Sequence, residues 1–120
     1  AAAADRVLSL HHGTLHSEAF NHTKGTQRSG TIQAPAFAKE FHVYAMDWSK
    51  DRITIELDGK AYATFDRKEG DKAEQWPFQK PYYVILTLAI GGSWGGQQGI
   101  DEAAFPQRME VDHVRVYQKK

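Results

Sequence analysis

The segment RITIELDGKAYATF (52–65) constrains the fold more than any other part of the chain. The apolar residues of its first half alternate with polar ones, which is the two-residue period of a half-buried strand. Asp58-Gly59 follows, and this dipeptide favours the tight turn that joins two antiparallel strands. The segment therefore predicts a β-hairpin, and its apolar face needs a second sheet to cover it.

Further segments with strand character surround this hairpin. They are RVLSLHHGTLHS (6–17, with Gly13 as an expected bulge), TIQAP (31–35), FHVYAMDWS (41–49), PYYVILTLAIGG (81–92) and MEVDHVRVYQ (109–118). Residues 20–30 predict a polar loop. Bulky residues on both alternate sets of 41–49, and the nearly continuous apolar run of 81–92, predict strands covered on both faces. The fold class is thus all-β, an antiparallel sandwich or jelly roll that is incomplete in these residues.

Composition limits the possible partners and sites. The 120 residues make one domain or part of one, and 15 basic and 15 acidic side chains give no net charge, so nothing predicts a nucleic acid or an acidic membrane as partner. Cysteine is absent, and no apolar run has the roughly 18 residues of a membrane span. No secretory signal is visible. Residues 1–5 are interpreted as a cloning remnant or unidentified residues, and 6–120 as domain sequence.

Three carboxylates in EGDKAEQWPF (69–78) have a spacing that some glycosidases use for their catalytic acids: Glu69, Asp71 and Glu74. Retaining hydrolysis needs two carboxyl groups about 5–5.5 Å apart, which a strand provides because residues two apart share a face. The intervening residues would have to be apolar to anchor that strand, but here they are glycine, lysine and alanine. The segment therefore predicts an exposed loop, and no catalytic residue is assigned in this chain.

Four motifs, in this order, carry a family resemblance: HHGTLHSE, FHVYAMDWSKDRITIELDGK, WPFQKPYYVILTLAIGGSWGG and FPQRMEVDHVRVYQ. Together they resemble the second half of family 16 glycoside hydrolases, most of all the laminarinase-like endo-β-1,3-glucanases. The resemblance implies a concanavalin-like jelly roll with a sugar-binding cleft along its concave sheet. It also implies retaining hydrolysis of internal β-glucosidic bonds, with 6–120 as the C-terminal half of the catalytic domain.

The resemblance implies substrate-binding residues. Trp94 in GGSWGG occupies a cleft position, and its flanking glycines provide little local core for it. His12, Thr14 and His16 would line the cleft beside the catalytic strand if no bulge interrupts their alternation, with a solvated surface histidine as the alternative for His16. Thr87 stands where the family usually has a cleft-facing asparagine.

Two other tryptophans and one aspartate have different interpretations. Trp48 and Trp76 are interpreted as packing residues of the core or its rim. Asp112 resembles a family aspartate that helps to hold a structural calcium ion, which requires several oxygen ligands. The alternative for Asp112 is an exposed strand residue facing Arg115 or Lys119. No cofactor is expected for catalysis.

The family motif E-[ILV]-D-x-(x)-E, which carries the catalytic carboxylates, would fall at or before residues 1–4 and is absent there. The expected function is part of an endo-acting retaining β-glucanase for β-1,3 or mixed-linked β-1,3-1,4 glucan. The alternative is a non-catalytic carbohydrate-binding or structural fragment. Expected partners are the glucan and either the N-terminal half of the same domain or a second copy of this chain. The resemblance implies a secreted or periplasmic location.

Overall fold

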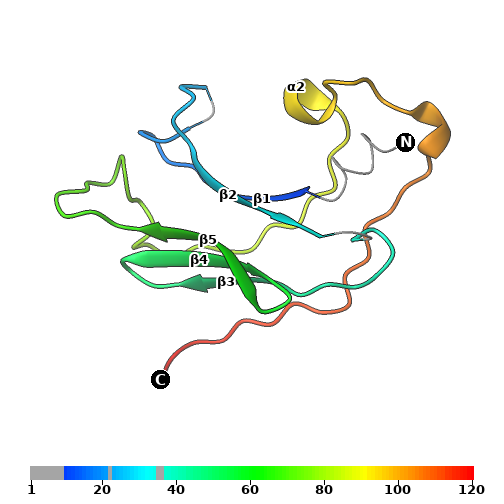
Figure 1. The fold of residues 1–120 in the computed structure, drawn as a ribbon. Helices are drawn as coiled ribbons and strands as arrows, with labels where there is room; N and C mark the ends of the chain where they lie inside the picture. Colours follow the sequence, from blue (N-terminus) through cyan, green and yellow to red (C-terminus); the bar gives the residue numbers. More distant parts are fainter. Residues whose placement is uncertain (1–9, 22, 35–36) are drawn as a thin grey trace. The chain divides into compact units, whose positions relative to one another are not determined.

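The computed structural model describes residues 10–21, 23–34 and 37–120, which divide into two units, one up to Pro81 and one from Tyr82 to Lys120 (Figure 1). The first unit contains β1 (Leu10–Leu15), β2 (Arg28–Gln33), β3 (Tyr44–Trp48), β4 (Arg52–Leu57) and β5 (Lys60–Asp66). The second contains the single turn α2 (Gly92–Gly95) and the 3-10 helix Glu102–Ala104. All strand pairs are antiparallel, so the predicted all-β class is confirmed.

β1 and β2 form a two-stranded sheet that differs from the sequence prediction in two ways. β2 starts at Arg28, inside the segment predicted as a loop. Gly13 forms no bulge, because it pairs directly with Gly30 in an uninterrupted ladder. Position 30 requires glycine because a side chain would not fit there. A Cβ on Gly30 would lie 2.6 Å from the carbonyl oxygen of Tyr62. Pro35, the expected end of this strand, lies outside the described residues.

β3, β4 and β5 form a three-stranded sheet, and the predicted β4–β5 hairpin is confirmed. Asp58 and Gly59 have φ values of 51° and 80°, the left-handed conformation that a two-residue turn of this kind requires. The carboxylate of Asp58 lies 2.6 Å from Nδ1 of His42 and also accepts the N–H of Val43. A bulge opposite Ile55 and Glu56 shifts the register of the pair.

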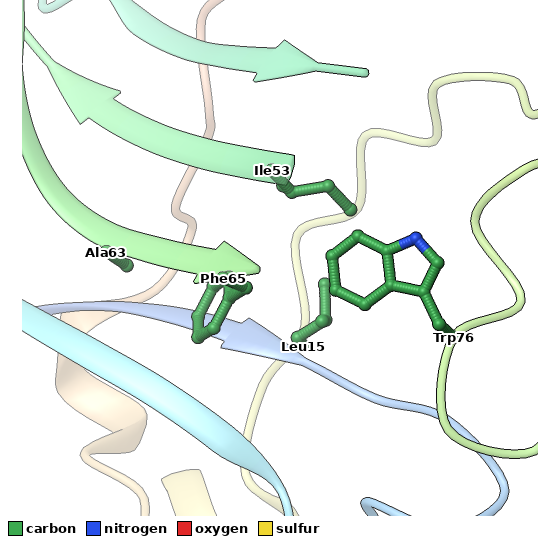
Figure 2. Close-up of a cluster of buried hydrophobic side chains, with 5 residues drawn as sticks. All are labelled: Leu15, Ile53, Ala63, Phe65 and Trp76. Atoms are coloured by element: carbon green, nitrogen blue, oxygen red, sulfur yellow. The ribbon is translucent and has the colours of Figure 1, made fainter. Parts of the chain in front are cut away.

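The two sheets pack face to face, with the β1–β2 hairpin over β5 (Figure 1). Their core consists of Leu15, Ile53, Ala63, Phe65 and Trp76. Figure 2 shows these side chains converging from three strands and from the loop after β5. The Trp76 indole N–H donates to the carbonyl of Lys50 at 2.7 Å, so its burial leaves no polar atom unsatisfied. The interpretation of Trp76 as a packing residue is confirmed.

The cover over this core reaches β3 at Tyr44, whose hydroxyl lies 3.1 Å from Nε2 of His11, and leaves much of this strand exposed. Tyr44, Met46 and Trp48 pair with β4 residues that face the core, yet they are 58%, 59% and 37% exposed. The prediction that 41–49 is covered on both faces is therefore wrong for the described residues. The hairpin β1–β2 packs mainly on β5, so this inner row of β3 stays largely exposed. Trp48 lies at the rim, where its indole N–H donates to the carbonyl of Phe78 at 2.8 Å.

The second unit contradicts two strand predictions. Residues 82–90 and 109–118 contain no strand, and their side chains are exposed. A strand needs a neighbour to pair its N–H and C=O groups, and within the described parts of the chain neither segment has one. None of the described helical segments has the length and apolar character that crossing a bilayer requires.

Candidate functional site

The β1–β2 hairpin presents one polar face. Successive strand residues point to opposite sides, so the register assigns six residues to this face: Leu10, His12, Thr14, Ser29, Thr31 and Gln33. We call these six residues the outer face. His12 lies opposite Thr31, and Thr14 lies opposite Ser29. Five of the six side chains carry a hydroxyl, imidazole or amide group.

The outer face points away from the other sheet because the alternate residues make the contacts with it. Leu15 is part of the buried core. A Cβ on Gly13 would lie 3.0 Å from the side chains of Ile55 and Tyr62. Nε2 of His11 lies 3.1 Å from the Tyr44 hydroxyl, and burial raises the pKa of that tyrosine. These positions pack against the other sheet, so the outer face lies on the side of the β1–β2 sheet that points away from it.

The loop after β1 is held by specific contacts. The N–H of Ala19 donates to the carbonyl of Glu74 at 2.8 Å. The Arg28 guanidinium lies 5.4 Å from the ring centre of Phe65 and 6.0 Å from that of Phe20. Exposed His16 follows directly on β1, so this loop fixes the backbone next to it. His12 and Thr14 therefore share a face as predicted, while His16 lies beyond the end of the strand.

The other sheet has an outer face of different character. It carries Asp47, Arg52, Glu56 and Asp66, which alternate with the core-facing residues. Nε of Arg52 lies 2.6 Å from the Asp66 carboxylate, and this hydrogen bond raises the pKa of the guanidinium. The β1–β2 outer face has no carboxylate, ammonium or guanidinium group. It can donate and accept hydrogen bonds, but it offers no carboxyl group for acid–base catalysis.

The second unit holds the other two predicted binding residues. Trp94 lies in α2, follows Gly91 and Gly92 with positive φ, and is 68% exposed. An exposed indole provides a flat apolar surface, which is the group expected to stack on a sugar ring. Thr87 lies in the exposed segment 82–90. The binding roles of both residues stay predictions.

The carboxylates of 69–78 lie in turns after β5, as the loop interpretation predicts. Asp71 accepts the N–H of Lys68 at 2.8 Å, which is a local turn contact. Glu69 and Glu74 are exposed. Throughout the described residues no Asp or Glu is buried, so none has the desolvated environment that typically raises the pKa of a catalytic acid.

Asp112 could offer one carboxylate group to a metal ion. Its Oδ2 lies 3.2 Å from Nδ1 of His113, and its side chain is 77% exposed. The described residues contain no group of three or more acidic, histidine or cysteine side chains that could hold a metal ion. Calcium takes six to eight oxygen ligands, so an ion at Asp112 would need further oxygen atoms, and the calcium role of Asp112 stays a prediction.

Comparison with known proteins identifies the family. The family model described as "Glycosyl hydrolases family 16" matches residues 7–115. The chain belongs to family 16 of the glycosyl hydrolases. The resemblance seen in the four sequence motifs is thereby confirmed, and so is the jelly-roll class that it implied.

Relatives of the chain include a β-glucanase of Rhodothermus marinus, 46% identical over 88% of this chain and 38% of the relative. A keratan-sulfate endo-1,4-β-galactosidase of Sphingobacterium multivorum is 32% identical over 91% of this chain and 25% of the relative. The crystal structure of SCLam, a non-specific endo-β-1,3(4)-glucanase, superposes with a TM-score of 0.77 at 47% identity, over 82% of this chain and 37% of that one. The chain thus spans between a quarter and two fifths of these three proteins.

The sequence interpretation missed the β2 half of the outer face. Ser29 was assigned to a loop, and Thr31 and Gln33 were assigned to a strand without a role. The signal was present in SGTIQ (29–33), where glycine and isoleucine alternate with hydroxyl and amide residues. It became informative only with the register, which places Thr31 opposite His12.

Proposed function

We propose that these residues are part of an endo-acting retaining β-glucanase that hydrolyses β-1,3 or mixed-linked β-1,3-1,4 glucan. The observation that carries this proposal is the 46% identity to a β-glucanase over 88% of the chain. The similarity to an endo-β-1,3(4)-glucanase structure supports internal cleavage and both linkages. In this family-16 fragment, His12, Thr14 and Trp94 would bind sugar rather than cleave it.

The proposed chemistry requires a carboxyl pair from polypeptide outside these residues. A retaining enzyme uses one carboxylate as nucleophile and one carboxylic acid as proton donor, about 5–5.5 Å apart. No described carboxyl group is buried, and the described strands carry no E-x-D-x-x-E sequence. His12 and Thr14 would donate hydrogen bonds to sugar hydroxyls beside that pair, and His16 would hydrogen-bond near it.

The open inner row of β3 supports a polypeptide partner. Tyr44, Met46 and Trp48 are large, exposed and aligned on one face. Within the described residues the outer edge of β3 pairs with no strand, and such an edge favours addition of another strand. We propose the N-terminal half of the same domain as the occupant, with a second copy of this chain as the alternative.

Two further expectations follow from the family. Polymeric glucan does not cross membranes, which supports a secreted or periplasmic location. A structural calcium ion at Asp112 would need further oxygen ligands, from backbone carbonyls or from the N-terminal half of the domain. Calcium titration followed by the amide signal of Asp112 tests this, and unchanged signals at millimolar calcium in the complete domain would contradict it.

The first test is intact mass under native and denaturing conditions, followed by laminarin hydrolysis with the same sample. We expect no reducing-sugar release from a verified 120-residue chain, and release when a polypeptide with the carboxyl pair is present. Release by the 120 residues alone would contradict the assignment of the catalytic pair. The proposed function would be contradicted if the complete domain released no reducing sugar from laminarin or from mixed-linked β-1,3-1,4 glucan.

A non-catalytic carbohydrate-binding fragment is the second candidate. It is favoured because no carboxylate among the described residues is buried. Laminarin binding without hydrolysis by the complete domain would establish this candidate. Hydrolysis lost on replacing the carboxyl pair would exclude it.

A further inference from the structure

The β2 row of the outer face, Ser29, Thr31 and Gln33, has a regular position beside the predicted binding residues of β1. We infer that this row is a second line of contacts for the sugar and that it selects an uncharged glucan chain. The inference rests on the proposed function, because it extends the same binding surface by one strand. No residue of this row was among the predicted binding residues.

The geometry supports a continuous contact surface. Residues directly opposite on neighbouring antiparallel strands have Cβ atoms about 4.5–5.5 Å apart, and residues two apart along a strand are about 6.6–6.8 Å apart. Thr31 lies opposite His12, and Ser29 lies opposite Thr14. These four side chains therefore form a compact grid of hydrogen-bonding groups. A pyranose ring presents hydroxyl groups around its rim, so a ligand crossing the hairpin would meet both rows.

The packing beneath the hairpin determines which of its faces points outward. Gly13 and Gly30 pair at the centre of the hairpin, and a Cβ on Gly30 would lie 2.9 Å from the Cβ of Ala63. The absence of side chains there lets the hairpin approach β5 closely. Ser29 and Thr31 are exposed on the opposite side of the same backbone. The β2 row is thus presented by a backbone fixed through packing, which lowers the cost of ordering the site on binding.

Charge defines the class of ligand. The outer face of β1–β2 carries no carboxylate, ammonium or guanidinium group, while the outer face of β3–β5 carries Asp47, Arg52, Glu56 and Asp66. Burying an unpaired charge against a neutral sugar is costly, whereas hydroxyl and amide groups exchange water for sugar hydroxyls at little cost. A sulfated or carboxylated glycan would instead need arginine or lysine, which pair with anionic oxygens. The composition of the face therefore fits a neutral glucan.

The test measures the Kd of a laminarin oligosaccharide for the 120-residue chain. Where the chain alone is unstable, the complete domain is used instead. Thr31→Val keeps the shape and the strand preference but removes the hydroxyl, and Gln33→Ala removes the amide. Each is expected to raise the Kd about five- to tenfold, since each removes one or two hydrogen bonds. The matched control is Thr64→Val, at an exposed position of β5 that pairs with Thr54 on the other sheet. It should leave the Kd unchanged.

Two further measurements make the outcome decisive. Amide signals of 28–33 should shift on titration with the oligosaccharide, and a sulfated galactan at the same concentration should leave them unchanged. Normal binding by both variants with unshifted β2 signals would overturn this inference and leave the proposed function intact. Tighter binding of the sulfated galactan would overturn the neutral-ligand assignment. No glucan binding by the wild-type complete domain would overturn both proposals together.

Discussion

β4 and the segment 84–90 show that apolar composition alone does not determine a buried strand. VILTLAI (84–90) is more apolar than RITIEL (52–57), yet Ile85 and Ile90 are 69% and 57% exposed while Ile53 and Leu57 are 3% and 4% exposed. β4 lies between β3 and β5 and under the β1–β2 hairpin. Segment 84–90 pairs with no described strand.

The comparison shows where apolar burial contributes to the free energy of unfolding. Burial of a large apolar side chain contributes about 1.5–3 kcal/mol, and this contribution exists only where another layer covers the residue. The first unit contains that cover, whereas the side chains of the second unit are exposed. Stability should therefore depend on residues of the first unit, and substitutions in the second should affect binding instead.

The largest effect is expected for Phe65→Ala. Phe65 is 4% exposed in the core, so its truncation should lower the free energy of unfolding by about 3–5 kcal/mol. Tyr83→Ala is the matched control, because Tyr83 is 83% exposed and its truncation should cost less than about 0.5 kcal/mol. Urea denaturation followed by tryptophan fluorescence measures both. Equal losses would show that 82–120 is as well packed as the first unit.

Gly30→Ala, which adds one methyl group where β2 packs on β5, should have the next largest effect. Gly30→Ala places a Cβ 2.6 Å from the Tyr62 carbonyl oxygen, a backbone atom with little freedom to move. We expect a loss of about 1–3 kcal/mol from overpacking. Gly95→Ala is the control, since a Cβ there meets nothing within 4 Å. Thermal unfolding compares them, and an unchanged midpoint for Gly30→Ala would contradict the close packing of β2 on β5.

Trp94→Ala tests whether the second unit contributes to binding rather than stability. Removal of the indole should weaken laminarin-oligosaccharide binding about tenfold, which corresponds to about 1.4 kcal/mol, and leave the unfolding midpoint unchanged. Trp94→Phe should restore most of the affinity, because the flat ring remains. Isothermal titration calorimetry measures the Kd. A fall in the unfolding midpoint with unchanged affinity would show that Trp94 is a packing residue.

The smallest effect concerns the end of the β4–β5 hairpin. The hydrogen bond from His42 lowers the pKa of Asp58 below the usual value of 3.8, assisted by the N–H of Val43. The folded state therefore binds this proton less readily than the unfolded state, so the stabilisation is present above pH 3.8 and is lost as the pH falls through the folded value. Thermal unfolding at several pH values measures this effect. Asp58→Asn should unfold at a lower temperature than wild type at pH 6, and the difference in unfolding temperature should vanish below the folded-state pKa of Asp58.

The control for this experiment is Asp101→Asn in the second unit. Asp101 accepts the N–H of Ala103 at the start of the 3-10 helix, away from the β4–β5 hairpin in sequence. Its substitution should leave the unfolding midpoint of the first unit unchanged at every pH. A difference between wild type and Asp58→Asn that grows toward acidic pH would reverse the predicted sign and contradict the role of the Asp58 carboxylate.

The candidate site was predictable from sequence only in part. His12 and Thr14 follow from alternation along one strand, and their shared face was predicted correctly. Ser29, Thr31 and Gln33 were missed because a face is completed by a second strand, and the register between two strands depends on pairs distant in sequence. Gly13 shows the same limit, since the sequence indicates a special position but not that another strand causes it.

The sequence by itself determined the β4–β5 hairpin, the all-β class and the family. Positive φ at Asp58 and Gly59 is a property of two adjacent residues, and the alternation of β4 is local. The tertiary structure decided which apolar segments are covered. Trp76 is buried because β1, β4 and β5 converge on it, and 84–90 is exposed because no described strand pairs with it. Burial and strand pairing are shared between distant residues, so a single segment cannot specify them.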